Sequence, residues 1–327
     1  MKIASQSPTT LNGTSPWTRL FRRSILLMAS VSKTTEPYSI TSFSSFETHH
    51  ILAPINELLQ PDPVEIVTPV VKADSTWRTT IDQFWSIIRK HFDLRRDTSC
   101  GMHIHVSPVQ SRFDIGQLRC IAKAVVLWER DTARCAPPSR DDRVQNFCLS
   151  NVLGAVPAAR SIQAHGPLRG LRHAFRHIDH ASRNDIVDYV CPDKHRAWNF
   201  LPARETGHGS VEFRRPPGVT TGKKAKHWIA FTMAFIDMAL RSNLDRVARR
   251  LSKHSLRHRR ADKTSGSSLN FEDLLLASAE HLGVYCNLDP RLHQLDEPRS
   301  LHITMMRPNQ INWLQRFDDD YHLSASA

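Results

Sequence analysis

The clearest alternation of apolar and polar residues runs from residue 101 to residue 107. The apolar positions recur at every second residue: Met102, Ile104 and Val106. Because successive side chains of a β-strand point to opposite faces, this pattern predicts a strand that is buried on one face. Its polar face then carries two histidines, His103 and His105.

Two further segments predict strands that carry acidic residues. The stretch 64–71 is rich in β-branched residues, is punctuated by Pro69 and contains Glu65. In the stretch 210–214, Val211 and Phe213 alternate with polar residues. The polar positions of that stretch share one face of the predicted strand: Ser210, Glu212 and Arg214.

Apolar residues at intervals of three or four predict three helices, over residues 77–92, about 115–129, and 223–240. The second helix begins at Asp114, which forms a capping-box sequence with Gln117. The segment 184–190 fits either a short helix or a strand.

These elements together predict an α+β fold. We expect a poorly ordered N-terminal extension over residues 1–62 and a main domain over 63–245. We expect a basic linker with a small helical appendage over 246–327. No stretch reaches the ~18 consecutive apolar residues of a membrane-spanning helix, so we expect no membrane partner and a cytoplasmic location.

The first 35 residues contain no Asp or Glu, but they contain Arg19, Arg22 and Arg23 and a short apolar run from Ile25 to Ala29. An acid-poor composition rich in Arg and Ser is typical of an organelle transit peptide, so mitochondrial targeting is an alternative to the cytoplasm. A disordered tail and an incorrectly assigned gene start are the other interpretations.

Charge and cysteine content narrow the function little. The net charge of +12 fits a nucleic acid, an anionic membrane surface or a nucleotide as partner, and the basic residues are spread along the whole chain. None of the six cysteines forms a C-x-x-C pair. Their spacing favours reduced thiols over a zinc finger or a disulfide framework.

The polar faces of the predicted strands carry candidate metal ligands. His103 and His105 are about 7 Å apart at Cα, near enough to serve one metal ion or to take adjacent roles. Glu212 and Arg214 place an anion beside a cation, and a surface ion pair is the simpler interpretation.

The order of four motifs along the chain resembles the putative amidoligase family, which is itself similar to glutamine synthetase and the glutamate–cysteine ligases. The resemblance extends from about residue 64 to residue 240. It implies a glutamine synthetase-like, mainly antiparallel sheet with helices packed on one face. It also implies an ATP-dependent carboxylate–amine ligase that forms an amide or isopeptide bond through an acyl phosphate. The motifs are V-E-I-V-T-P at 64–69, S-C-G-M-H-I-H-V-S at 99–107, N-F-L-P at 199–202 and G-S-V-E-F-R at 209–214.

The resemblance also implies roles for individual residues. It implies that Glu65, His103 and Glu212 hold Mg²⁺ or Mn²⁺. It implies that His105 contacts the substrate and that Arg214 contacts phosphate. The partners would be ATP and a small-molecule or peptide carboxylate and amine. Three further positions correspond to family residues that contact substrate or nucleotide: Arg140, Arg143 and Asn199.

The sequence departs from the family in one respect. The family opens with a G-x-E-x-E strand that supplies the first metal carboxylates, whereas Glu36, Glu47 and Glu57 lack that spacing here. Two metal ions need about four or more carboxylate ligands, and this chain offers two. We therefore expect a poor or inactive ligase.

Two other functions remain open from the residues. A zinc-dependent hydrolase would use His103, His105 and Glu212 as its three ligands. A basic nucleic-acid-binding protein would use residues 241–263, where nine Lys or Arg oppose two Asp. That stretch has no aromatic residue on which bases could stack, so a nucleic acid is not the expected partner.

Overall fold

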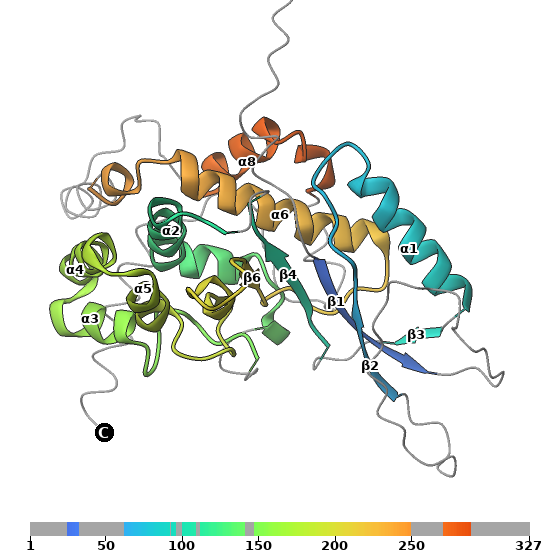
Figure 1. The fold of residues 1–327 in the computed structure, drawn as a ribbon, viewed down its shortest axis with the longest axis horizontal. Helices are drawn as coiled ribbons and strands as arrows, with labels where there is room; N and C mark the ends of the chain where they lie inside the picture. The colour runs from blue at the N-terminus through green and yellow to red at the C-terminus, as the bar shows by residue number, and fades with distance from the viewer. Residues whose placement is uncertain are drawn as a thin grey trace, which may run out of the picture.

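The computed structural model describes residues 25–32, 62–91, 93–95, 100–108, 112–140, 147–249 and 271–288 of the chain. In this part of the chain six strands form one antiparallel sheet in the order β2–β1–β4–β6–β5, and β3 pairs with β1 (Figure 1). The strands are β1 (Ile25–Ser32), β2 (Asp62–Val67), β3 (Asp93–Arg95), β4 (Met102–Val106), β5 (Trp198–Asn199) and β6 (Val211–Phe213).

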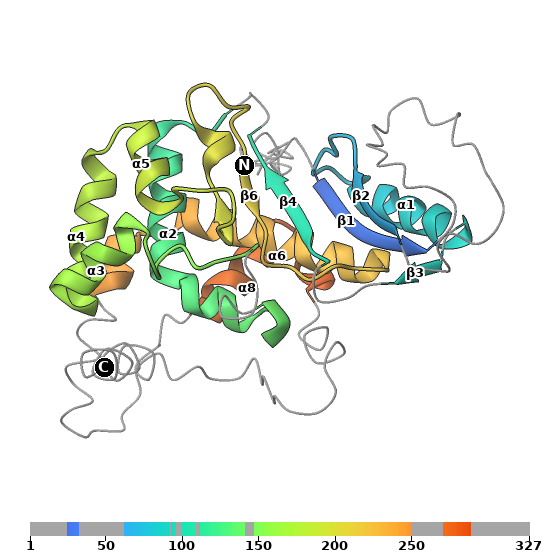
Figure 2. The same ribbon diagram turned by 90° about the horizontal axis from the view of Figure 1, so that it is seen from below.

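Several helices surround the sheet, so the predicted α+β fold is confirmed. Figures 1 and 2 show α6 running along the sheet, with α1 near its β2 end and α2 to α5 beyond its β6 end. The helices are α1 (Trp77–His91), α2 (Ile115–Arg134), α3 (Pro157–His165), α4 (Pro167–His180), α5 (Arg183–Val190), α6 (Gly222–Arg241) and α8 (Phe271–His281). None of these described helices is long and apolar enough to cross a lipid bilayer.

Local sequence explains where two of the helices begin. Asp114 accepts a hydrogen bond from the backbone of Gln117, whose side chain accepts one in return, so the predicted capping box starts α2. Ser182 and Asp185 form a second capping box at α5, and this selects a helix for the segment that fitted either a helix or a strand. Each box satisfies backbone N–H groups that the first helical turn leaves without partners.

The apolar face of the sheet packs on α6. Met102, Ile104 and Phe213 are each less than 2% exposed. The ring centroid of Phe213 lies 5.7 Å from that of Phe231 on α6, in a stacked arrangement. Burial on this side fixes the register of β4 and β6, because a slip of one residue would bring the polar residues into the core.

The backbone register aligns the polar residues on the other face. His105 of β4 lies opposite Glu212 of β6, and Asn199 of β5 lies opposite the same glutamate. Directly opposed residues of an antiparallel sheet share a face, so the three positions form one row across the strands.

The structure differs from the expected domain division in two segments. Residues 25–32 form β1, between β2 and β4, although the sequence left residues 1–62 outside the folded part. This apolar run shows no alternation of its own, and its partners lie far along the chain, so pairing defines it as a strand. At the other end, Phe271 of α8 packs near Phe231 and Phe235, so part of the expected appendage joins the main core.

Candidate functional site

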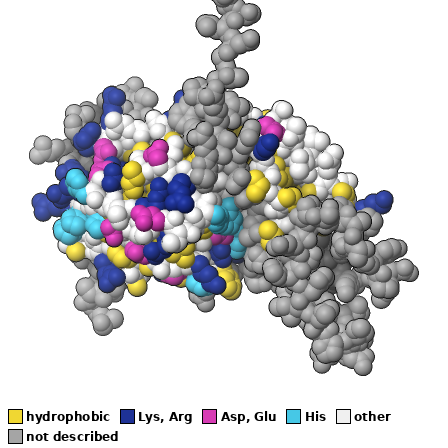
Figure 3. All heavy atoms as spheres, in the orientation of Figure 1, with side chains coloured by type: hydrophobic (Ala, Val, Ile, Leu, Met, Phe, Trp, Pro, Cys, Tyr) yellow, Lys and Arg dark blue, Asp and Glu magenta, His cyan; other side chains and the backbone are white. Residues whose placement is uncertain are grey.

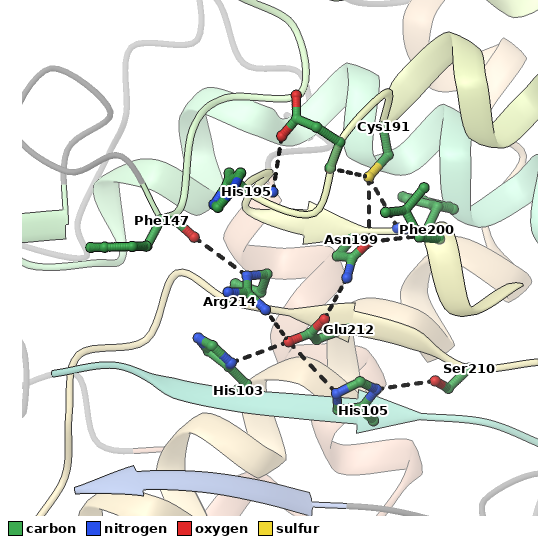
Figure 4. A network of polar contacts seen from close by, with 12 residues as sticks. His103, His105, Phe147, Cys191, His195, Asn199, Phe200, Ser210, Glu212 and Arg214 are labelled. Carbon is green, nitrogen blue, oxygen red and sulfur yellow. Dashed lines mark hydrogen bonds and ion pairs between the residues drawn. The ribbon is translucent and has the colours of Figure 1, made fainter. Parts of the chain in front are cut away.

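The carboxylate of Glu212 is the centre of a polar cluster on the open face of the sheet (Figure 4). Its Oε1 atom lies 2.6 Å from Nη1 of Arg214, 3.2 Å from Nδ1 of His103 and 3.6 Å from Nε2 of His105. Its Oε2 atom accepts a hydrogen bond of 2.6 Å from Nδ2 of Asn199. Five of the eight residues predicted for the site therefore meet here: Glu212 and the four residues that surround its carboxylate.

The strands explain why these side chains meet. Glu212 and Arg214 are two residues apart, so they extend to the same side, as the alternation predicted. Arg214 is held in place by its backbone N–H, which donates to the carbonyl of Ala197 at 2.8 Å. Its Nε also donates to the carbonyl of Phe147 at 3.4 Å.

The cluster is sheltered but reaches solvent at two points. The side chain of Glu212 is 3% exposed, whereas those of His105 and Arg214 are 15% and 14% exposed. A group of histidine side chains reaches the surface over β4 in Figure 3. A ligand from solvent can therefore meet the imidazole and the guanidinium before it meets the carboxylate.

Burial keeps both imidazoles of β4 neutral near pH 7. Burial, together with the positive charges of Arg214 and Arg140, lowers the pKa of His103 to about 2. Burial also lowers the pKa of His105, although the negative charge of Glu212 opposes that shift. A neutral imidazole has a free lone pair, which is the form that binds a metal ion or accepts a proton.

A hydroxyl group links His105 to a second histidine that the sequence did not single out. Nδ1 of His105 lies 3.2 Å from Oγ of Ser210, and that oxygen lies 3.1 Å from Nε2 of His208. Ser210 was placed on the polar face by its alternation with Val211. His208 lies in the loop before β6, where no periodicity signals its position.

Asn199 is fixed from three sides. Besides its bond to Glu212, its Oδ1 accepts from the backbone N–H of Leu201 at 3.0 Å and lies 3.6 Å from Sγ of Cys191. The residue is 5% exposed. Its position beside the carboxylate agrees with a place in the site, and its contacts show that it orients Glu212.

Arg140 holds the ends of β4 and β6 together from within the protein. The residue is 1% exposed, and its guanidinium donates to the carbonyls of Arg215, Arg214 and Cys100 at 3.1, 2.9 and 3.4 Å. Gly101 leaves room for this side chain, since a Cβ atom there would lie 2.9 Å from Nη2 of Arg140. These contacts indicate a positioning role, and the predicted contact of Arg140 with substrate or nucleotide stays a prediction.

Two predicted site residues lie outside the described part. Arg143 belongs to residues 141–146, and the side chain of Glu65 is also outside it. The backbone of Glu65 pairs with Met28 of β1, and Leu26 of the same strand pairs with His103. By this register, positions 65 and 103 belong to the same face of the sheet.

The cluster offers few donors to a metal ion in the described residues. Among them no group of three or more His, Cys, Asp or Glu side chains has an arrangement that could hold a metal ion. One carboxylate and one imidazole, those of Glu212 and His103, lie 3.2 Å apart at the nearest atoms. This pair fits Mg²⁺ or Mn²⁺ when phosphate and water supply the other ligands, since Mg²⁺ takes one or two carboxylates from proteins and keeps several waters.

Comparison with known proteins identifies the family. The sequence profile of a family described as "Putative amidoligase enzyme" matches residues 31–236, which include β2 to β6 and the whole Glu212 cluster. No curated protein matches the chain. The match spans more than half of the chain, so the chain belongs to this amidoligase family, as the four motifs predicted.

Proposed function

We propose that this member of the amidoligase family is an ATP- and divalent-metal-dependent carboxylate–amine ligase. The observation that carries the proposal is the convergence of Glu212, Arg214 and two neutral imidazoles on one open sheet face. ATP would phosphorylate the substrate carboxylate. The amine nitrogen would then attack the acyl carbon and form a C–N bond. Phosphate would leave with the electrons of the broken C–O bond, and the nitrogen would release a proton to solvent.

A glutamine synthetase-like arrangement is part of the proposal. The antiparallel sheet has α6 on its apolar face and the Glu212 cluster on the other. A nucleotide and an acid would approach the cluster at His105 and Arg214, whose side chains reach solvent.

The roles of the residues follow from their contacts. Glu212 and His103 would hold Mg²⁺ or Mn²⁺, which when bound neutralises phosphate charge. Arg214, whose guanidinium reaches solvent, would bind the phosphoryl oxygens. His105 would contact the substrate, because its imidazole is neutral and lies at the exposed side of the carboxylate. Asn199 would keep Glu212 oriented.

The composition of β1 limits the activity that we expect. Its sequence, ILLMASVS, contains no Asp or Glu, and it occupies the position between β2 and β4. A strand in that position with two carboxylates would add ligands to the face that carries His103. Without them we propose weak metal binding and low turnover, and a robust ATP hydrolysis that requires both Mg²⁺ and an amine would contradict this part.

Calorimetric titration of Mn²⁺ tests the metal ligands. Glu212→Gln and His103→Ala should each weaken binding by about tenfold or more, because each removes a direct ligand. His105→Ala should leave the affinity within about twofold, because this imidazole contacts substrate. Equal affinities for the wild-type protein and Glu212→Gln would overturn the proposed site.

The same experiment distinguishes the zinc hydrolase. In that case His103→Ala and His105→Ala would weaken Zn²⁺ binding alike, since both imidazoles would be ligands. The contact of Glu212 with Arg214 favours the ligase. A cationic guanidinium beside the carboxylate suits phosphate better than a closed three-ligand zinc site.

A further inference from the structure

One face of α4 is cationic over its whole length. Its basic residues recur at intervals of three, one, three, one and three positions. These spacings place them within a single face, about 16 Å long, of a helix with 3.6 residues per turn. All are exposed except His173, which is half-buried. The residues of this α4 basic face are Arg169, Arg172, His173, Arg176, His177 and His180.

The opposite face of α4 is fully used by the fold. It consists of the buried residues Leu171, Ala174, Phe175 and Ile178. Among the described side chains of α4, no apolar side is therefore left to insert into a lipid bilayer, as an interfacial membrane helix requires.

The charge of the α4 basic face is not neutralised within the described structure. None of Arg169, Arg172 and Arg176 forms an ion pair or a side-chain hydrogen bond with another described residue. The one acid of α4, Asp179, is paired instead with Lys123 at 2.6 Å. Like charges at such spacings destabilise a helix by roughly 0.2–0.5 kcal/mol per pair, so helix stability does not explain their presence.

Flat aromatic surfaces lie among these charges. His173 stacks on His165 of α3, with ring centroids 4.4 Å apart and an interplanar angle of 15°. His177 stacks on Tyr189 of α5 at 3.9 Å and 24°. Figure 3 shows histidine and basic side chains gathered over α3 and α4 at one end of the molecule. This end lies beyond the β6 side of the sheet, away from the Glu212 cluster (Figure 1).

Arginines beside stacked histidine rings favour one class of ligand. Three guanidinium groups repel a metal cation, so these histidines do not favour a metal site. Guanidinium groups bind phosphate oxygens, and histidine rings offer planes on which unpaired bases stack. We propose that the α4 basic face, with His165, binds single-stranded nucleic acid, the arginines contacting phosphates and the stacked rings contacting bases.

This surface differs from the basic stretch 241–263 that the sequence suggested. That stretch contains two histidines, His254 and His258, but no Phe, Tyr or Trp. On the α4 basic face, histidine rings stack on His165 and Tyr189. The inference is independent of the proposed ligase activity, because it uses none of the residues around Glu212.

Fluorescence anisotropy of a labelled oligouridylate with the full chain tests the proposal. Replacing Arg169, Arg172 and Arg176 together by Gln should weaken binding about tenfold or more. It should also reduce the steepness of log K against log salt concentration by about 2, because each of the three lost phosphate contacts contributes about 0.7. The control carries Lys72→Gln, Arg89→Gln and Lys90→Gln, which remove the same charge from exposed positions in and beside α1. It should stay within about twofold of the wild-type protein.

Three results would overturn the proposal. The first is an absence of binding at low salt. The second is an equal loss of affinity in the two triple variants, which would assign binding to net charge alone. The third is equal affinity for inorganic polyphosphate, for polyglutamate or for anionic vesicles, which would show that bases are not recognised. A circular dichroism spectrum that matches the wild-type protein establishes that each variant is folded.

Discussion

Two neighbouring arginines form two buried ion pairs of the same length. Nη1 of Arg214 lies 2.6 Å from Oε1 of Glu212, and Nη2 of Arg215 lies 2.6 Å from Oε1 of Glu129. The side chains of Arg214 and Arg215 extend to different sides of the chain at the end of β6. The first lies on the open face of the sheet, and the second lies against α2.

The surroundings of the two pairs separate their roles. The side chains of Arg215 and Glu129 are 2% and 4% exposed, so that pair is sealed inside the fold. Arg214 is 14% exposed, and its glutamate is shared with two imidazoles and an amide. The same Arg–Glu contact therefore serves the fold in one place and the candidate site in the other, and access to solvent with additional polar partners marks the site.

The largest effect should come from breaking the sealed pair. Arg215→Ala should lower the free energy of unfolding by about 3–5 kcal/mol, because it leaves a buried carboxylate without its counter-charge. Arg214→Ala should cost less, about 1–2 kcal/mol, because His103 and Asn199 stay beside Glu212. Urea denaturation followed by circular dichroism measures both.

A double variant serves as the control. Glu129→Leu with Arg215→Met removes both charges at similar volume, so it should be less destabilised than Arg215→Ala alone. If Arg215→Ala and Arg214→Ala lowered stability equally, the contrast between the two pairs would be lost.

A third carboxylate, that of Asp131 on α2, has a weaker counter-charge: Arg134, whose side chain is 38% exposed, lies 3.5 Å away. Asp131 lies two residues after Glu129 on α2, and burial raises its pKa to about 6, although Arg134 opposes the shift. The folded protein therefore holds a proton here that the unfolded chain releases at about pH 4, and this stabilisation is lost as the pH rises through about 6. Asp131→Asn should raise the free energy of unfolding by about 1–2 kcal/mol above pH 7.

The pH dependence identifies the cause of that gain. The advantage of Asp131→Asn over the wild-type protein should be largest above pH 6 and should shrink towards pH 4, where the carboxyl is protonated in both states. Denaturation at several pH values measures it. An advantage that stayed constant with pH would assign the effect to packing and not to the buried charge.

A smaller effect should follow from crowding Arg140. In Gly101→Ala the new Cβ atom would lie 2.9 Å from Nη2 of Arg140, so the guanidinium must move away from the carbonyls of Arg214 and Arg215. The flexible end of the side chain can yield, so we expect a loss of about 1–2 kcal/mol. Gly116→Ala is the comparison at the start of α2, where the new Cβ atom would lie 3.2 Å from Oδ1 of Asp114, a milder approach than at Gly101. A loss no larger than that of Gly116→Ala would contradict the positioning role of Arg140.

The sequence predicted those parts of the molecule that depend on local pattern. The alternation in β4 and β6 placed His105 and Glu212 on a polar face, and the capping box at Asp114 placed the start of α2. These features depend on neighbours a few residues apart. The alternation in β6 was also consistent with a surface ion pair between Glu212 and Arg214. The carboxylate of Glu212 is buried, so this interpretation is excluded.

The features that the sequence did not predict depend on contacts between distant segments. Arg140 lies in a polar loop of the sequence, yet its guanidinium donates hydrogen bonds to the carbonyls of Arg214 and Arg215, about 75 residues later. The pair of Glu129 and Arg215 spans 86 positions. A short apolar run such as 25–32 becomes a strand through its pairing with β2 and β4. No periodicity of a single segment carries this information.

The smallest effect should come from the hydroxyl of Ser210, and it sharpens the description of the site itself. Ser210 has one hydrogen to donate and two histidine partners. Nε2 of His105 lies 3.6 Å from the carboxylate of Glu212, so we expect this nitrogen to carry the proton and Nδ1 to accept from Ser210. In that arrangement the oxygen of Ser210 would accept from Nε2 of His208. Ser210→Ala should cost less than about 1 kcal/mol in stability, because His105 stays near solvent. It should nevertheless change the tautomer of His105 from Nε2–H to a mixture, which ¹⁵N chemical shifts of the imidazole report directly.

His103 is the internal control, since its Nδ1 lies beside Glu212 and its signals should not move. An unchanged His105 tautomer in Ser210→Ala would show that the carboxylate alone orients this ring and that Ser210 takes no part in the site.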